Sequence, residues 1–322
     1  MQDFPYYWLF RANERPFKMF YRALLPRGWR NKINLYASHR QQEYTAKAWD
    51  VFLADYFAGK YPHFQMTAKQ PHLAGEKIIW LYWGQGWDER NLPEIVKMCR
   101  KSVGRYAANY RVIELDDANL TEYLDFPDFV WDKKQHNKAF KPAFFADILR
   151  LALLECYGGV WLDATVYLTA PLPEKYVAMD YFMFYRSQNA ENQSDWEKLN
   201  ADCFSWRPNH PVNVQNNIIF AKCRNRVIGT CLDVMLNFWA TQNRIPHYFF
   251  FQIMYDRLMA DYLADMRCPV EDDTLPHLLL LNFNRPFNQS VFESILQKSS
   301  LHKLDRRLKI HAGTFGEHLN RL

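Results

Sequence analysis

Two charged residues on a predicted helix and a carboxylate at the end of a predicted strand could act together. Asp147 and Arg150 are three residues apart, so on a helix they share one face. Asp163 follows the apolar residues 160–162, which can form a short buried strand with the carboxylate at its tip. The three groups can therefore converge on one ligand. The simpler alternatives are an intrahelical salt bridge worth about 0.3–0.5 kcal/mol and a surface or helix-capping role for Asp163.

The elements that hold these residues are a helix, a turn and a strand in direct succession. Pro142 fixes a φ angle suited to the first turn of a helix, and residues 143–157 contain no Gly or Pro. Gly158 and Gly159 can take the left-handed conformation that ends a helix. The sequence thus predicts a helix over 142–157 that turns into a strand over 160–162.

Strands and helices also alternate before this segment. Residues 77–83 and 110–115 have the composition of strands, residues 92–103 have the pattern of a helix, and Asp117 can cap a short helix that follows. Such alternation predicts an α/β fold with a mostly parallel sheet covered by helices. Ligands of these folds bind beyond the carboxyl ends of the strands.

An aromatic residue, Trp83, ends the first of these predicted strands. It could belong to the core, as most strand aromatics do, but a flat ring at a strand end also suits stacking on a nucleobase. Because side chains alternate along a strand, Tyr82 points to the opposite face. Tyr82 and Trp80 are the alternative stacking residues.

The rest of the chain continues the mixture of helices and strands. Short aromatic or β-branched runs indicate strands, and longer stretches with helical spacing indicate helices. The polar residues 187–200 indicate a loop. The predicted strands are 181–185, 217–221, 278–283 and 308–311, and the predicted helices are 38–57, 225–243 and 247–264.

The central motif resembles a known family. Ala146-Asp147-x-x-Arg150, followed by Tyr157-Gly158-Gly159-Val160-Trp161-Leu162-Asp163-Ala164-Thr165, is similar to the sugar-nucleotide segment of glycosyltransferase family 32, and within it to the bacterial capsular polysaccharide synthesis branch. The Lys-Ile-Ile strand that ends in Trp extends the similarity over about residues 76–305. The resemblance implies a Rossmann-like GT-A fold and transfer of a sugar from a nucleotide donor with retention. We expect an N-terminal helical extension over 1–75 and a GT-A catalytic domain over 76–322.

The resemblance implies roles for the charged residues. Asp147 would accept hydrogen bonds from donor-sugar hydroxyls, and Arg150 would help to fix the donor. Asp163 would bind Mn²⁺ or Mg²⁺, which would neutralise the leaving diphosphate. Many relatives have a second carboxylate where this chain has Thr165, so Thr165 would offer a weak oxygen contact or hold a metal-bound water.

Residues near the C-terminus are further candidates for this site. His302 and His311 could complete the metal ligands, although a lone His is more often structural. A His-Lys-Leu sequence in this region resembles the capsular branch. Alternatively, the basic residues Lys303, Arg306 and Arg307 could hold the diphosphate directly.

Three amides are candidates for the reaction centre. Gln215, Asn216 and Asn217 open a predicted strand in the region where relatives place residues near the anomeric carbon. An amide is a poor nucleophile, which favours displacement on the same face with the leaving phosphate accepting the proton of the acceptor. The alternative is that they are ordinary turn residues.

Composition limits the other possibilities. The net charge of +5 is modest and the basic residues do not form a nucleic-acid module, so we expect no nucleic-acid partner. The six cysteines are scattered without a Cys-x-x-Cys pair, which favours reduced thiols in a cytoplasm. Residues 1–32 mix aromatic and basic side chains and could lie on the inner face of a bacterial membrane, or form an arm packed on the body.

The sequence therefore predicts a cytoplasmic, membrane-associated, retaining glycosyltransferase. Its donor would be a nucleotide sugar, with UDP favoured, and its acceptor a capsular or surface polysaccharide, free or lipid-linked. One alternative is a non-catalytic nucleotide-sugar-binding module, because a second carboxylate is missing. The other is a haloacid-dehalogenase-like phosphohydrolase, whose nucleophile strand also ends in Asp but in an Asp-x-Asp pattern that Thr165 breaks.

Overall fold

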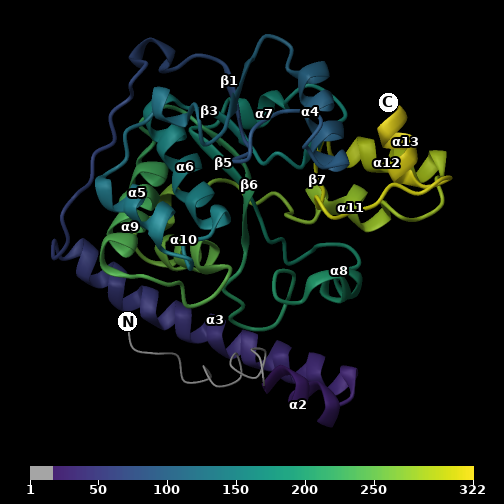
Figure 1. The fold of residues 1–322 in the computed structure, drawn as a ribbon, viewed down its shortest axis with the longest axis horizontal. Coiled ribbons are helices and arrows are strands. Elements are labelled where there is room, and N and C mark those ends of the chain that lie inside the picture. Colours follow the sequence, from purple (N-terminus) through teal and green to yellow (C-terminus); the bar gives the residue numbers. More distant parts are fainter. Residues whose placement is uncertain (1–16) are drawn as a thin grey trace. The chain divides into compact units, whose positions relative to one another are not determined.

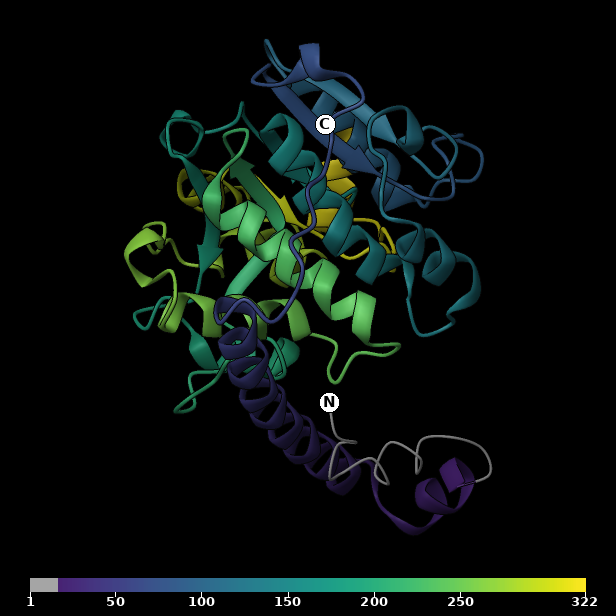
Figure 2. The same cartoon turned by 90° about the vertical axis from the view of Figure 1, so that its left-hand side faces the viewer.

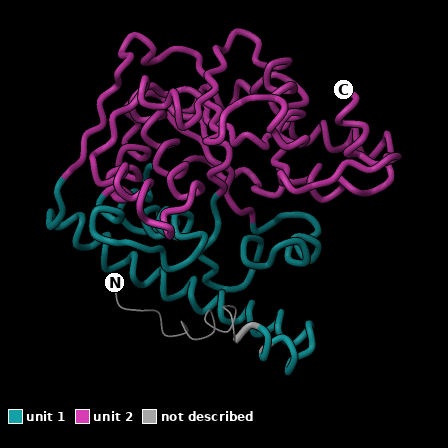
Figure 3. The backbone as a smooth tube through the Cα atoms, viewed as in Figure 1, with its two compact units in different colours: residues 1–62, 188–214, 237–267 teal, residues 63–187, 215–236, 268–322 magenta. Residues whose placement is uncertain are grey.

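The computed structural model describes residues 17–322, which form two compact units (Figure 3). The N-terminal extension predicted over 1–75 and the catalytic domain predicted over 76–322 stay predictions. The first half of the predicted membrane-binding segment lies outside the described residues. Unit 1 comprises residues 1–62, 188–214 and 237–267, and unit 2 comprises 63–187, 215–236 and 268–322.

A five-stranded sheet is the centre of unit 2 (Figure 1). Its order is β2-β1-β3-β6-β5; β1 pairs in parallel with β2 and β3, whereas β3 and β6 are antiparallel. The α/β prediction with a mostly parallel sheet is confirmed. The strands are β1 Ile78–Tyr82, β2 Arg111–Leu115, β3 Gly159–Leu162, β5 Tyr181–Tyr185 and β6 Val214–Ala221.

The helix, turn and strand that carry the charged residues form as predicted. Helix α6 (Pro142–Tyr157) packs against β1 and β3 and ends at Gly158. Gly158 and Gly159 have φ angles of 73° and 96°. A Cβ atom on Gly159 would lie 2.5 Å from the carbonyl oxygen of Ile78, so the parallel pairing of β1 with β3 requires glycine there.

A second, two-stranded sheet brings the C-terminal region to the end of β3. Strands β4 (Val166–Leu168) and β7 (Leu301–Lys303) are antiparallel, with Val166 opposite Lys303. The last helices form an apolar cluster with residues of α4 (Glu94–Tyr106), and these helices are drawn in yellow-green and yellow in Figure 1. They are α11 Leu278–Asn282, α12 Gln289–Lys298 and α13 Phe315–Arg321.

Unit 1 is built on the long helix α3 (Arg27–Phe57), which Figure 2 shows as a continuous helix. Its Trp49 stacks on Phe250, the first residue of α10 (Phe250–Ala260), and donates an indole hydrogen bond of 3.0 Å to the Phe250 carbonyl. A shorter helix, α2 (Phe17–Leu24), precedes α3. Among residues 17–322, no helix has the length and apolar composition that crossing a membrane requires.

Several local predictions were wrong. The strand predicted at 278–283 is instead helix α11 (Leu278–Asn282), and 308–311 form no strand; the strand in this region is β7. Residues 193–200, predicted as part of a loop, form helix α8 (Gln193–Asn200). Most of its residues are polar, and Trp196 is its buried residue. The short helix after β2 is Leu120–Glu122, and Asp116 rather than Asp117 accepts the backbone hydrogen bonds before it.

The other predicted elements are confirmed, with shifted ends. The strands predicted at 77–83, 110–115, 160–162, 181–185 and 217–221 correspond to β1, β2, β3, β5 and β6. The helix predicted at 38–57 is the C-terminal part of α3, and that predicted at 247–264 starts at Phe250. The helix predicted at 225–243 is α9 (Arg226–Thr241).

Candidate active site

Asp147 and Arg150 lie on one buried face of α6, because they are one helical turn apart. The Arg150 guanidinium is 3.3 Å from Asp147 Oδ1. It also donates to the backbone carbonyls of Ala146, at 3.0 Å, and of Asn216 on β6. The side chain of Arg150 is only 6% exposed. These contacts fix the guanidinium between α6 and the sheet.

Asp163 directly follows β3 and completes this cluster. Its Oδ1 accepts a 2.9 Å hydrogen bond from the Trp161 indole and lies 3.6 Å from Arg150. The Arg150 guanidinium also lies over the Trp161 ring, 5.2 Å from its centroid. The structure therefore brings the three predicted side chains, Asp147, Arg150 and Asp163, to one place. Asp163 is 25% exposed, so the cluster opens to solvent on the Asp163 side.

The C-terminal strand β7 adds a second cation. Lys303 Nζ lies 3.3 Å from Asp163 Oδ2 and donates a hydrogen bond to the Thr165 hydroxyl. The Leu304 N–H donates a hydrogen bond of 2.9 Å to the Thr165 carbonyl, which holds the end of β7 against the residues that follow β3. Thr165 thus contacts the Lys303 ammonium.

The two carboxylates titrate in opposite directions. Burial raises the pKa of Asp147 from 3.8 to about 6, and the nearby Asp163 adds to this rise, against the opposing effects of Arg150 and Asn216. Burial also acts to raise the pKa of Asp163, but Lys303, Arg150 and the Trp161 hydrogen bond together bring that pKa below its usual value. Asp163 is therefore an anion at neutral pH, whereas Asp147 takes up a proton in mildly acidic solution.

The three amides of β6 divide between the two faces of the strand. Asn216 faces the cluster and donates a hydrogen bond of 2.8 Å to Asp147 Oδ1. Gln215 and Asn217 lie on the other face, where Asn217 donates a hydrogen bond of 3.3 Å to Gln215 Oε1. Of the three predicted reaction-centre amides, the structure therefore brings only the side chain of Asn216 to the charged residues.

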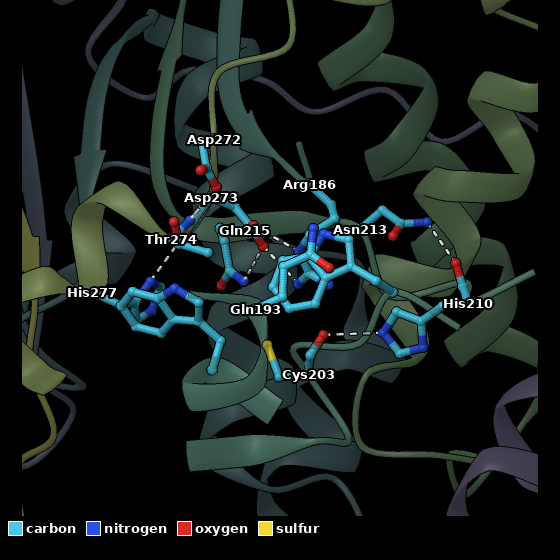
Figure 4. A network of polar contacts seen from close by, with 12 residues as sticks. Arg186, Gln193, Cys203, His210, Asn213, Gln215, Asp272, Asp273, Thr274 and His277 are labelled. Carbon is cyan, nitrogen blue, oxygen red and sulfur yellow. Dashed lines mark hydrogen bonds and ion pairs between the residues drawn. The ribbon is translucent and has the colours of Figure 1, made fainter. Parts of the chain in front are cut away.

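Gln215 instead completes a buried ion pair. Arg186 donates two hydrogen bonds of 2.8 Å to Asp273, and Gln215 donates a hydrogen bond of 3.1 Å to the same carboxylate. Dashed lines mark these contacts in Figure 4. The side chains of Arg186 and Asp273 are 1% and 0% exposed. This ion pair supports the start of β6, next to Asn216. Its two members are 87 residues apart in sequence, so no local pattern could have indicated it.

Trp83 lies just beyond the end of β1. Its ring is half-buried and packs with Leu92, Val96 and Ala164, the residue between Asp163 and Thr165. The exposed guanidinium of Arg306 lies 6.0 Å from the Trp83 centroid. Trp83 is thus close to the charged cluster, and Arg306 is an additional cation of this region. Trp80, by contrast, is fully buried, and its indole donates a hydrogen bond of 2.9 Å to the Gly158 carbonyl.

The two predicted histidine ligands lie elsewhere. His302 is fully buried on the face of β7 opposite Lys303, where its Nε2 is 3.2 Å from Thr169 Oγ1 and burial lowers its pKa to about 3. His311 is exposed, and its carbonyl accepts a hydrogen bond from Thr314. Within residues 17–322, no three or more His, Cys, Asp or Glu side chains form a group that could hold a metal ion.

Trp161 is a further residue of this site and was not predicted to belong to it. The indole of Trp161 both orients Asp163 and covers Arg150. Residues two positions apart on a strand share a face, so the Trp161–Asp163 spacing was a usable signal.

Two solved structures resemble this chain at low sequence identity. No curated protein matches the sequence. Among solved structures, the chain is similar to the PaToxG glycosyltransferase (13% identity, TM-score 0.36, covering 83% of this chain and 86% of that chain). It is also similar to a glycosyltransferase involved in the glycosylation of the major capsid of PBCV-1 (11% identity, TM-score 0.34, covering 76% of this chain and 98% of that chain).

The pattern of one protein family matches nearly the whole chain, over residues 29–318, which contain every charged residue of the site described above. That family is described as capsular polysaccharide synthesis protein. The chain belongs to this family, and it is a glycosyltransferase of capsular polysaccharide synthesis.

Proposed function

We propose that the chain transfers a sugar from a UDP-sugar to a capsular glycan with retention of the anomeric configuration, and that the donor binds at Asp147, Arg150, Asp163 and Lys303. The observation that carries the proposal is the convergence of two carboxylates and two cations at the end of β3, with one ammonium accessible to solvent. An accessible ammonium beside a strand end suits a diphosphate.

Each residue has a role that its contacts support. Asp147 accepts hydrogen bonds from donor-sugar hydroxyls, and Asn216 orients it through the 2.8 Å hydrogen bond. Arg150 helps to fix the donor by holding Asp147 and Asp163 in place through its contacts with both. Trp83 offers its ring to the nucleobase, with Arg306 above it.

The cluster supports displacement on one face of the sugar. Oxygens of Asp147 and Asp163 accept contacts from Asn216, Arg150, Trp161 and Lys303, so neither carboxylate is a free nucleophile. In the proposed step, the bond from the anomeric carbon to the diphosphate oxygen breaks and its electron pair stays on the phosphate. The acceptor oxygen forms the new bond on the same face, and its proton passes to the leaving phosphate. The contacts of Asp163 with Trp161, Arg150 and Lys303 also argue against a phosphohydrolase, because that enzyme would use Asp163 as its nucleophile.

Transfer assays with UDP-sugars test this proposal. The full chain is incubated with each UDP-sugar and a capsular oligosaccharide, UDP release is measured, and proton NMR gives the anomeric configuration of the product. We expect retention, and a loss of roughly 10²-fold in rate for Asp147→Asn, which removes a charged acceptor aimed at the sugar. The control is Asp180→Asn, which changes a 79% exposed carboxylate. An inverted product, or full activity in Asp147→Asn, contradicts the proposal.

We further propose that the N-terminal helices contact the inner face of the cytoplasmic membrane, where a lipid-linked acceptor would lie. Met19, Phe20 and Leu24 of α2 and Trp29 of α3 are 67–78% exposed, which is unusual for large apolar side chains. Arg22, Arg27 and Arg30 lie among them and suit anionic headgroups. The cysteines are free thiols, in keeping with a reducing compartment.

Vesicle co-sedimentation tests the membrane contact. We expect the chain to pellet with vesicles that contain phosphatidylglycerol and to bind less to pure phosphatidylcholine. The double substitution Phe20→Ser/Leu24→Ser should reduce binding, whereas Val270→Ser, which changes an exposed apolar residue of unit 2, should not. Equal pelleting of all three proteins contradicts the proposal.

A further inference from the structure

We infer that Lys303 takes the place of a divalent cation in this site, so that the donor diphosphate binds without metal. The inference rests on the proposed function, because it concerns how the nucleotide donor is held. Lys303 is 138 residues from Thr165 in sequence, and the pairing of β4 with β7 brings them together. The ammonium lies between the Asp163 carboxylate and the Thr165 hydroxyl.

The oxygen ligands at this strand end do not fit Mn²⁺ or Mg²⁺. Such an ion takes about six oxygen ligands at close to 2.1 Å, which in nucleotide sites are one or two carboxylates with phosphate oxygens and waters, so it needs a carboxylate oxygen that is open to it. The Asp163-x-Thr165 motif offers one carboxylate and one neutral hydroxyl. Asp163 Oδ1 already accepts from Trp161 and faces Arg150, and Oδ2 faces Lys303. A divalent ion would have to displace Lys303 and would then lie beside Arg150.

The neighbouring carboxylate does not make up the deficit. Asp147 Oδ1 accepts from Asn216 and lies 3.3 Å from Arg150. The two histidines considered as metal ligands, His302 and His311, lie outside the cluster, and the described part of the chain holds no larger group of ligand side chains. Both oxygens of Asp163 and Oδ1 of Asp147 therefore already face cationic, indole or amide donors.

The cations that are present match the charge of the donor. The diphosphate of a nucleotide sugar carries about two negative charges, and one more develops on the phosphate as the sugar leaves. The Lys303 side chain is 21% exposed, so its ammonium can contact a phosphate while Asp163 positions it. Arg306 over Trp83 adds a second exposed cation. In the transfer step Lys303 donates hydrogen bonds to the leaving oxygen and keeps its protons, because the acceptor supplies the one that is transferred.

Isothermal titration of the full chain with UDP tests the inference. We expect the Kd for UDP to agree within twofold in EDTA and in MnCl₂. Lys303→Met should weaken UDP binding tenfold or more under both conditions, and Lys303→Arg should restore most of it. The matched control is Lys309→Met, an exposed lysine of the same region, which should change the Kd less than twofold. Circular dichroism confirms that each variant is folded.

Three outcomes separate this inference from the proposed function. If UDP binds only with Mn²⁺, the inference is wrong and the UDP donor stands. If UDP binds under neither condition, the UDP donor is wrong, and inorganic pyrophosphate then tests the inference alone. Pyrophosphate binding in EDTA that depends on Lys303 supports it, and binding that requires Mn²⁺ or is absent overturns it. Thr165→Asp should create a measurable Mn²⁺ site, since it restores a second carboxylate.

Discussion

The raised pKa of Asp147 makes a quantitative prediction about stability. Burial, together with Asp163, raises this pKa from 3.8 to about 6. The folded chain therefore holds the proton more tightly than the unfolded chain does. Asp147 contributes stability that is fully present below about pH 4 and is lost as the pH rises through about 6. This rise in pKa corresponds to about 3 kcal/mol in total.

The comparison of wild type with Asp147→Asn isolates this contribution, because an amide cannot titrate. We expect the free energy of unfolding of wild type, relative to the variant, to fall by about 2–3 kcal/mol between pH 4 and pH 7.5. Urea unfolding followed by tryptophan fluorescence at half-unit pH steps measures it. Asp180→Asn, at an exposed position, is the control. A difference that is constant would show that Arg150 offsets burial, and one that grows with pH would show that Arg150 outweighs it; either result would refute the reasoning.

Three further predictions follow from the same contacts. Asp273→Asn leaves the buried Arg186 without its counter-charge and should destabilise the chain by about 3–5 kcal/mol in urea unfolding; a loss under 1 kcal/mol would contradict a buried pair. Gly159→Ala should lower the melting temperature sharply, since its Cβ would meet the Ile78 carbonyl at 2.5 Å, and an unchanged melting temperature would refute the parallel β1–β3 pairing. Trp83→Ala should weaken the binding free energy of UDP by about 1–3 kcal/mol, because base stacking is lost, and should leave pyrophosphate binding unchanged in the same titration. An equal loss for both ligands would argue against base stacking.

The parts of the site that lie close together in sequence could be predicted. The Pro142 start, the glycine pair and the spacing of Asp147 and Arg150 are local signals, and the structure has the predicted helix, turn and strand. Asp163 follows from the same run, because a strand of three apolar residues must end there. Local propensity and chain geometry thus determine three of the four charged residues of the cluster, Asp147, Arg150 and Asp163.

The remaining contacts depend on long-range pairing that no local pattern encodes. Lys303 reaches Thr165 only because β7 pairs with β4, and residues 301–303 were not predicted to be a strand. The run of leucines at 278–281 has the composition of either a buried strand or a buried helix, and α11 forms there because Leu279 packs into the apolar cluster of the C-terminal helices. His302 and Lys303 are neighbours on opposite faces of one strand, so their roles could not be separated without its register.

A crystal structure of the chain with UDP bound tests the central claim most directly. The account predicts that a phosphate of UDP lies within hydrogen-bond distance of Lys303 Nζ, beside Asp163, with the base on Trp83. Density for a diphosphate at another place on the chain would contradict the assignment of this cluster as the donor site.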